Sequence, residues 1–216
     1  MPQPVPTPLR EVLEQAHHAM QQHPQHALLP IYRYKIYQAM REAAGSHADR
    51  VRVQLALLSA RKVLPIWYEQ RPNDPWPEQL MATAESIVQG HASKEAGFAL
   101  AQRAFDRVVA LGSEWRGPGT AEINEYAQSA AEAAVQALYE ASGIFHLSKP
   151  QDARENETNA DLDPWSSDPA LWAEMAYTGG VWDPASDLQR REEFWEWWLF
   201  EAIPQAWQKG RGAGQR

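Results

Sequence analysis

Apolar residues recur at spacings of three and four along most of the chain, which is the period of an amphipathic α-helix. In the segment 93–111, for example, Phe98, Ala101, Phe105 and Val108 mark one face. Segments of this kind are separated by glycine and proline, which end helices. No run alternates with the period of two that marks a half-buried strand. We therefore expect an all-α fold, a single bundle-like domain of about seven to eight helices, over 8–22, 30–44, 48–70, 77–89, 93–111, 120–141, 169–178 and 186–208.

Local signals set the expected ends of these helices. Thr7 before Pro8 is a typical helix start, and Ser186 with Gln189 resembles a capping box that opens the last helix. Asp168 before Pro169 is a further predicted cap, and Gly112 a predicted stop. Two prolines inside helical patterns, Pro65 and Pro204, predict kinks.

The domain is expected to cover 8–208 and to contain a long acidic loop at 144–167, where no helical period is sustained. The flanking segments, 1–7 and 209–216, are expected to be disordered, because they are short, polar and rich in proline or glycine.

The last helix contains the segment FWEWWLF at 194–200, which is too aromatic for a solvent-facing helix. A wheel at 100° per residue gives it two apolar faces and a polar stripe between them. One face holds Phe194, Trp195, Trp198 and Ala202, the other holds Trp197, Phe200, Pro204 and Trp207, and the stripe holds Glu192, Glu193 and Glu196. The first face can meet the bundle, and the second needs cover from the 144–185 segment or from a partner.

Charge adds a second feature to the same region. The net charge is −8, and residues 151–201 alone carry 13 acids against three bases. Seven of the ten tryptophans also lie beyond residue 164. Aromatic anchors within a charged rim are typical of protein interfaces, and a field of one sign attracts an oppositely charged partner. The predicted partner-binding residues are therefore Asp161, Asp163, Trp165, Asp168, Trp182, Asp183, Glu193 and Glu196.

The chain lacks the sequence motifs of several common enzymes and binding proteins. It has no cysteine, no glycine-rich phosphate loop and no HExxH or GxSxG motif, so we expect no enzyme, no metal and no cofactor. Clustered lysine and arginine are missing, which disfavours nucleic acid as a partner. Without a membrane-length apolar run or a signal peptide, a cytoplasmic location without membrane contact is expected.

Two alternatives stay open at this point. Glu14 and His17, with His18, have the Glu-x-x-His spacing of di-iron bundle enzymes, although a second such pair is missing. An aromatic pocket near Trp195 and Trp198 would instead indicate a protein that binds a small ligand.

The segment RVRVQLALLSARKVLPIWYEQRPNDPWPEQLMATAESIVQG at 50–90, followed by FWEWWLFEAIPQAW at 194–207, resembles family five of the bacterial immunity proteins of polymorphic toxin systems. The shared features are a leucine-rich helix ending in LPIW, a proline-rich turn with Asp74 and Pro77, a helix before Gly90, and a tryptophan-rich last helix. The resemblance implies an all-helical, non-enzymatic cytoplasmic protein that binds and neutralises a cognate toxin. A basic toxin such as a nuclease would fit the acidic charge.

Overall fold

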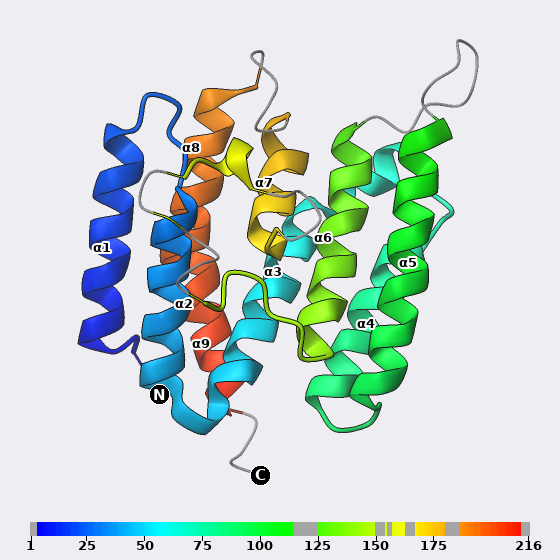
Figure 1. The fold of residues 1–216 in the computed structure, drawn as a ribbon, viewed down its shortest axis with the longest axis horizontal. Coiled ribbons are helices and arrows are strands. Elements are labelled where there is room, and N and C mark those ends of the chain that lie inside the picture. Colours follow the sequence, from blue (N-terminus) through cyan, green and yellow to red (C-terminus); the bar gives the residue numbers. More distant parts are fainter. Residues whose placement is uncertain are drawn as a thin grey trace.

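The computed structural model describes residues 4–114, 125–149, 154, 157–162, 167–179 and 186–212. These residues contain helices and no strand, which confirms the all-α prediction (Figure 1). The helices are α1 (Thr7–Gln22), α2 (Pro30–Ala44), α3 (Ala48–Gln70), α4 (Trp76–Val88), α5 (Lys94–Glu114), α6 (Glu125–Ala141), α7 (Pro169–Thr178), α8 (Leu188–Trp197) and α9 (Ile203–Gly212). Short 3₁₀ turns lie at Gly45–His47 and Asn159–Asp161, and a π-helical turn, Trp198–Ala202, joins α8 to α9.

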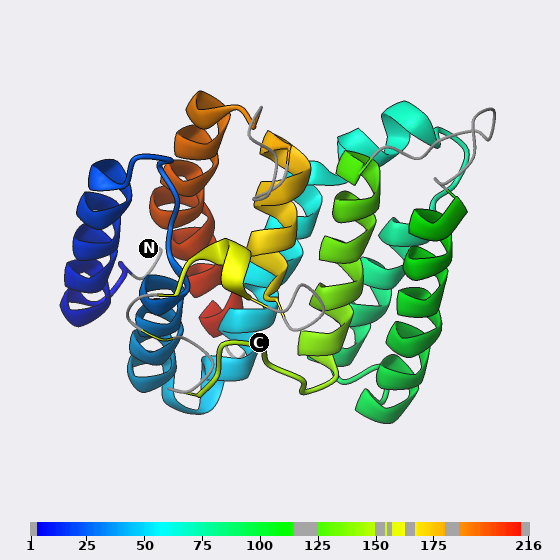
Figure 2. The same cartoon turned by 45° about the horizontal axis from the view of Figure 1, so that its top comes forward.

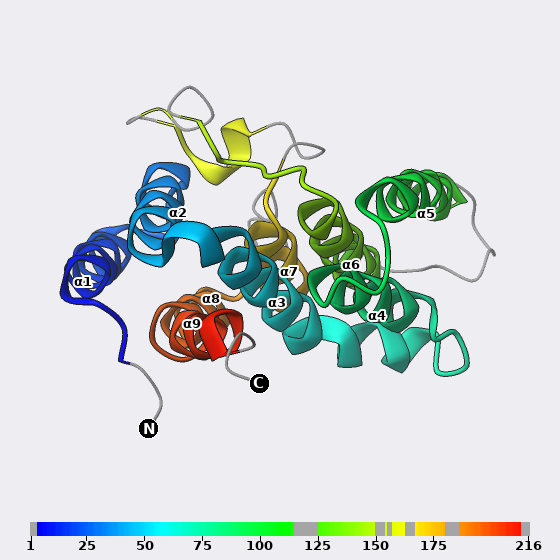
Figure 3. The same cartoon turned by 90° about the horizontal axis from the view of Figure 1, so that it is seen from below.

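The helices pack side by side in one row, and α3 lies in the middle of it (Figure 1). Helices α1 and α2 lie at one end of the row and α4 and α5 at the other, with α3, α6 and α7 between them (Figures 1 and 2). Seen from below, α9 lies against α3 on the side opposite the segment that follows α6, and α8 packs against α7 and α1 (Figure 3). The chain thus returns at its C-terminus to the helices with which it begins.

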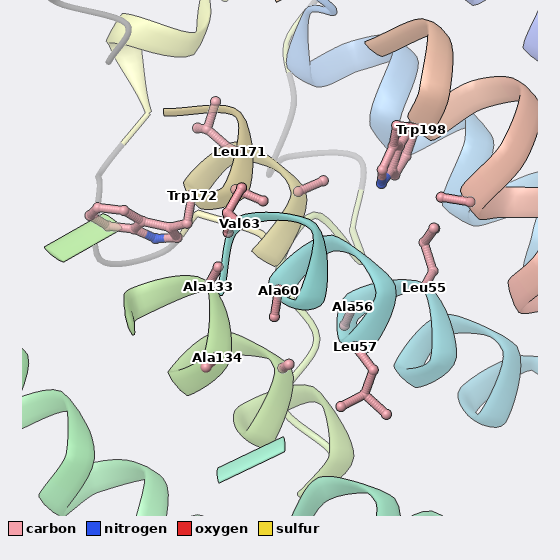
Figure 4. Packing of buried hydrophobic residues seen from close by; sticks show 14 of the residues in the cluster. Leu55, Ala56, Leu57, Ala60, Val63, Ala133, Ala134, Leu171, Trp172 and Trp198 are labelled. Carbon is pink, nitrogen blue, oxygen red and sulfur yellow. The ribbon is translucent and has the colours of Figure 1, made fainter. Parts of the chain in front are cut away.

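Helix α3 is apolar on most of its circumference because other helices surround it. Its buried residues include Leu55, Ala56, Ala60 and Val63, and α3 contacts α2, α4, α6, α7 and α9. Figure 4 shows these side chains between α6, α7 and Trp198. The facing part of α6 is built from alanines such as Ala133 and Ala134, which let the two helices approach closely. The predicted helix at 48–70 is confirmed with both of its bounds.

The helix ends agree with the sequence in most places, and the differences are local. Asp168 caps α7 by accepting a hydrogen bond from the backbone N–H of Ala170, as predicted. Asp187, and not Ser186, caps α8, because its carboxylate accepts from the N–H of Arg190. Thr7 is not a cap, since its hydroxyl accepts from Arg10 within the first turn of α1.

Two helices run further than the sequence predicted. Helix α5 passes Gly112 and ends at Glu114, and α9 extends to Gly212, beyond the expected boundary at 208, while α3 runs through Pro65 to Gln70 as expected. In α9, Gly210 allows close packing because it has no side chain. A Cβ atom placed there would lie 2.6 Å from the Cα of Val51, so only glycine allows α9 to pack this closely on α3.

The wheel for the last helix is right at its start and wrong at its end. Phe194, Trp195 and Trp198 are fully buried, as expected for the core-facing side. Trp207 was assigned to the opposite face, but it is also fully buried. The π-helical turn at 198–202 has more residues per turn than an α-helix and shifts the register of everything after it. Trp207 is thereby rotated onto the core side.

Candidate functional site

Two buried arginines and the largely buried Arg52 bind three buried carboxylates, and each pair joins parts of the chain that are distant in sequence or lie on different helices. The pairs are Arg33 with Asp168, Arg52 with Glu140, and Arg191 with Glu174. A buried charge is tolerated only when a partner and hydrogen bonds replace its water. The first pair therefore fixes the acidic C-terminal third on α2, the second joins α3 to α6, and the third joins α7 to α8 within that third.

Arg33 and Asp168 form the innermost pair, and neither side chain is exposed. The Nε atom of Arg33 donates to Asp168 over 2.9 Å, and its Nη1 atom donates to the carbonyl of Leu28 and to Asn159, each over 2.6 Å. The other oxygen of Asp168 accepts from the Tyr37 hydroxyl over 3.1 Å. One residue of α2 thus holds both the 159–161 turn and the start of α7.

Arg191 and Glu174 connect α8 to α7. The Nε atom of Arg191 donates to Glu174 over 2.6 Å, and Nη2 donates to the Ser186 hydroxyl over 3.0 Å. The same carboxylate oxygen accepts from the Thr178 hydroxyl over 2.9 Å. This pair fixes the angle at which α8 leaves the residues before it.

Arg52 and Glu140 connect α3 to α6. Two nitrogens of Arg52, Nε and Nη2, donate to one oxygen of Glu140 over 3.1 and 3.0 Å, and Nη2 also bonds to the carbonyl of His146. Burial raises the pKa of the Glu140 carboxyl to about 7, although the Arg52 charge acts in the opposite direction. Nearby carboxylates and Tyr37 raise the pKa of Arg52 despite its burial, so its guanidinium stays charged.

On the outside of α8 and of the π-helical turn that joins it to α9 lies a surface that we call the α8–α9 acidic face, consisting of Glu193, Glu196, Phe200 and Glu201. The ring of Phe200 is 46% exposed, more than any other large apolar side chain described as exposed. Glu193 and Glu201 are exposed, and the side chain of Glu196 is also 46% exposed. His17 of α1 borders the face, since its Nε2 lies 3.1 Å from Glu196 Oε1 and its ring meets Phe200 edge-on at 5.0 Å.

The predicted partner-binding residues fall into three groups. Glu193 and Glu196 lie on the α8–α9 acidic face, and Asp161 is exposed at the end of the 159–161 turn. There the Thr158 backbone N–H and hydroxyl donate to Asp161 and lower its pKa. Asp163, Trp165, Trp182 and Asp183 lie outside the described residues.

Asp168 requires a correction, because we expected it at a partner surface and it is fully enclosed. Its acidity serves an internal pair with Arg33. The sequence analysis missed the three arginines and the exposed position of Phe200 beside carboxylates. A signal for Arg33 was present, since it precedes the buried Ile36, Tyr37 and Met40 at helical spacing.

The residues considered for a metal-dependent enzyme and for a small-ligand pocket do not form either site among the described residues. Glu14 and His18 are exposed on α1, while His17 is turned toward Glu196, so the three do not converge. Among the described residues no group of three or more histidines and carboxylates is arranged to hold a metal ion. Trp195 and Trp198 are fully buried, with ring centroids 5.7 Å apart, and Trp198 donates to the Ser59 hydroxyl. These indoles fill the core between helices and line no opening to solvent.

Glu132 is a buried carboxyl without an arginine. One oxygen accepts from the Gln136 amide over 2.7 Å, while its Oε2 and the Gln136 carbonyl oxygen have no hydrogen-bond partner among the described residues. Burial raises the pKa of Glu132 to about 7. The folded protein therefore holds this proton more tightly than the unfolded chain does.

A Glu132→Gln variant should be more stable than the wild type, and more so at high pH. Between the unfolded pKa of 4.5 and the folded value of about 7, wild-type stability falls as pH rises. In this range the unfolded chain releases the proton of Glu132, while the native state still holds it because a carboxylate would be unsolvated in the apolar site. The full shift corresponds to about 3 kcal/mol above pH 7. The glutamine stays neutral, and its amide can donate to Gln136.

Urea denaturation at pH 5 and pH 8 checks this expectation. The gain in unfolding free energy from Glu132→Gln should grow between the two pH values, while an exposed control, Glu14→Gln, should change little at either. A gain that is the same at both pH values would contradict the assignment.

Two comparisons place the chain among known proteins. The family model described as immunity protein Imm5 matches residues 13–205, which include every element from the middle of α1 to the start of α9. No curated protein matches the chain. In the described part of the chain, no helix has the length and apolar character needed to cross a bilayer. The match spans most of the sequence and agrees with the resemblance seen in the 50–90 and 194–207 segments, so the chain belongs to the Imm5 family of immunity proteins.

Proposed function

We propose that this protein binds a cognate bacterial toxin and neutralises it by occupying its surface, without a catalytic step. Membership of the Imm5 family supports the immunity role. The observation that carries the choice of surface is the exposed Phe200 ring beside Glu193, Glu196 and Glu201. An aromatic side chain surrounded by polar groups is the usual anchor of a protein interface.

The partner of this surface should be basic. The net charge of −8 is concentrated in residues 151–201, so the acidic side of the molecule attracts a positively charged toxin, such as a nuclease, over several ångströms. The residues of the acidic third outside the described ranges, Asp163, Trp165, Trp182 and Asp183, belong to the same proposal as further contacts.

The buried arginine pairs support this role indirectly. Arg191 holds the start of α8 against Glu174, and α8 carries Glu193 and Glu196. A surface whose helix is fixed in advance loses little conformational entropy when a partner binds. The acidic face is therefore preorganised for recognition.

The test uses the toxin encoded beside this gene, titrated against the purified protein by calorimetry. A double charge reversal, Glu193→Lys with Glu201→Lys, should weaken binding by about 100-fold, and Phe200→Ala should weaken it by about 10-fold or more. Raising the salt concentration should slow association with the wild type.

Glu69→Lys is the matched control, because Glu69 is an exposed acid on α3 outside the acidic face. It should leave the affinity within about 3-fold of the wild type. If the reversals on α8 and α9 weaken binding no more than this control, the proposed surface is wrong. If the neighbouring toxin does not bind at all, the proposed partner is wrong.

A further inference from the structure

A cavity lies at the corner where α2 turns into α3, on the side that the segment after α6 crosses. Its volume is about 300 Å³. The segment 143–149 leaves the end of α6 and passes over this corner (Figures 1 and 3). The walls come from all three elements, and they are Tyr37, Gln38, Met40, Arg41, Ala48, Asp49, Arg52, Phe145, Leu147, Ser148 and Lys149.

Arg52 forms the polar part of this wall, and its position is fixed. Its guanidinium carbon lies 4.0 Å from the centre of the Tyr37 ring and 5.0 Å from that of Phe145, so the group is held between two aromatic rings. Glu140 and the His146 carbonyl bind its Nε and Nη2 atoms. No hydrogen bond between described residues uses Nη1, which leaves two N–H groups of a largely buried, charged arginine for another acceptor.

The charge around the cavity is opposite to that of the whole protein. A second hollow of about 290 Å³ adjoins it and shares Asp49 and Phe145. Glu140 and Asp49 are the carboxylates lining the two hollows, and Glu140 is already bound to Arg52. The basic residues there are Arg41, Arg50, Arg52, Lys94 and Lys149. A positive site of this kind in a chain of net charge −8 favours an anion.

The apolar wall of the cavity includes a strained residue. Leu147 has φ of 53°, in the left-handed region that a leucine rarely adopts, and only 3% of its side chain is exposed. Strained backbone of this kind occurs preferentially where a binding site needs it. Here it turns Leu147 inward, beside Met40 and Phe145, to give the cavity an apolar side opposite its cationic one.

We propose that this cavity binds a small organic anion, with a carboxylate or phosphate group at Nη1 of Arg52 and an apolar body against Phe145 and Leu147. Arg41 at the rim adds further positive charge. A cavity of 300 Å³ is at the lower end of the size range of ligand sites. The site lies on α2, α3 and the 143–149 segment, away from the α8–α9 acidic face, so it goes beyond toxin binding and does not depend on it.

Calorimetry with three probes tests the proposal: phenyl phosphate, inorganic phosphate and benzyl alcohol. Phenyl phosphate should bind with a Kd of about 1 mM or tighter, and inorganic phosphate about 10-fold more weakly because it lacks the apolar body. Benzyl alcohol, which has the ring without the charge, should give no binding. Absence of phenyl phosphate binding up to about 10 mM, or equal binding of the alcohol, would overturn the proposal.

Two variants separate the charge of the site from its volume. Arg41→Gln removes a rim charge and should weaken phenyl phosphate binding by about 5-fold or more, while Ala48→Phe fills the cavity at unchanged charge and should abolish it. Arg103→Gln, on the exposed side of α5, is the control for net charge. Circular dichroism confirms that each variant is folded. Wild-type affinity in a folded Ala48→Phe variant would place the ligand elsewhere and overturn the assignment.

Discussion

An Asp168→Ala variant is expected to lose about 3–5 kcal/mol of unfolding free energy, because it leaves the charged Arg33 buried without its partner. Both side chains are fully enclosed, so water cannot replace the missing carboxylate. The Tyr37 hydroxyl and the backbone N–H of Ala170 lose an acceptor at the same time. A small domain is stable by only about 5–15 kcal/mol, so the loss should be visible as a large fall in the midpoint of urea denaturation.

Two further variants test whether the loss of stability in Asp168→Ala comes from the broken ion pair. Asp106→Ala removes an exposed aspartate from α5 and should change stability by less than about 0.5 kcal/mol. Adding Arg33→Met to Asp168→Ala removes the unpaired charge and should recover at least about 1 kcal/mol. A double variant that is less stable than Asp168→Ala alone would show that the ion pair is not the reason for the loss.

A Trp198→Ala variant should lose a similar amount, about 3–5 kcal/mol, through an opened cavity. Trp198 is fully buried, and its ring lies 5.7 Å from that of Trp195 and 6.1 Å from that of Tyr37. Its indole N–H also donates to the Ser59 hydroxyl over 3.2 Å. Denaturation followed by circular dichroism measures the change without relying on tryptophan fluorescence.

Trp198→Phe and Phe200→Ala are the matched comparisons. The phenylalanine keeps much of the aromatic packing and loses the hydrogen bond, so it should cost less than the alanine. Phe200 belongs to the same helical turn and is half exposed, and its replacement should cost less than about 1 kcal/mol. Equal losses at positions 198 and 200 would contradict the two-sided description of this helix.

The secondary structure could be predicted because its signals are local. The Pro30 start of α2, the Asp168 cap and the left-handed Gly179 after α7 each act within one helical turn. The apolar period identified α3 as the central helix for the same reason. The end of α9 was missed because tertiary packing there, with Gly210 close to Val51 of α3, outweighs the cost of a glycine inside a helix.

The internal ion pairs could not be predicted, since their partners are distant in sequence. Arg33 and Asp168 are 135 residues apart, and Arg52 and Glu140 are 88 apart. Charge alone suggested that Asp168 faces a partner, because aspartate is usually exposed. Recognising it as internal required knowing that α7 starts beside α2, which no local pattern of the acidic third reveals.

The burial of Trp207 depended on a single irregular turn. A wheel assumes 3.6 residues per turn throughout, whereas the 198–202 segment is π-helical. Pro204 lies two residues after its end and lacks the N–H that a regular helix would use there. Proline indicated a break in the helix, but not whether the break would bend its axis or rotate its faces.

The Arg33–Asp168 pair also constrains how a newly made chain can fold. Arg33 leaves the ribosome early, yet its carboxylate partner is translated 135 residues later. Until then α2 cannot bury this side chain without leaving a charge unpaired. We therefore expect the first two helices to stay loosely packed during synthesis. Their final packing needs Asp168, so the acidic third completes the N-terminal part of the fold as well as its own.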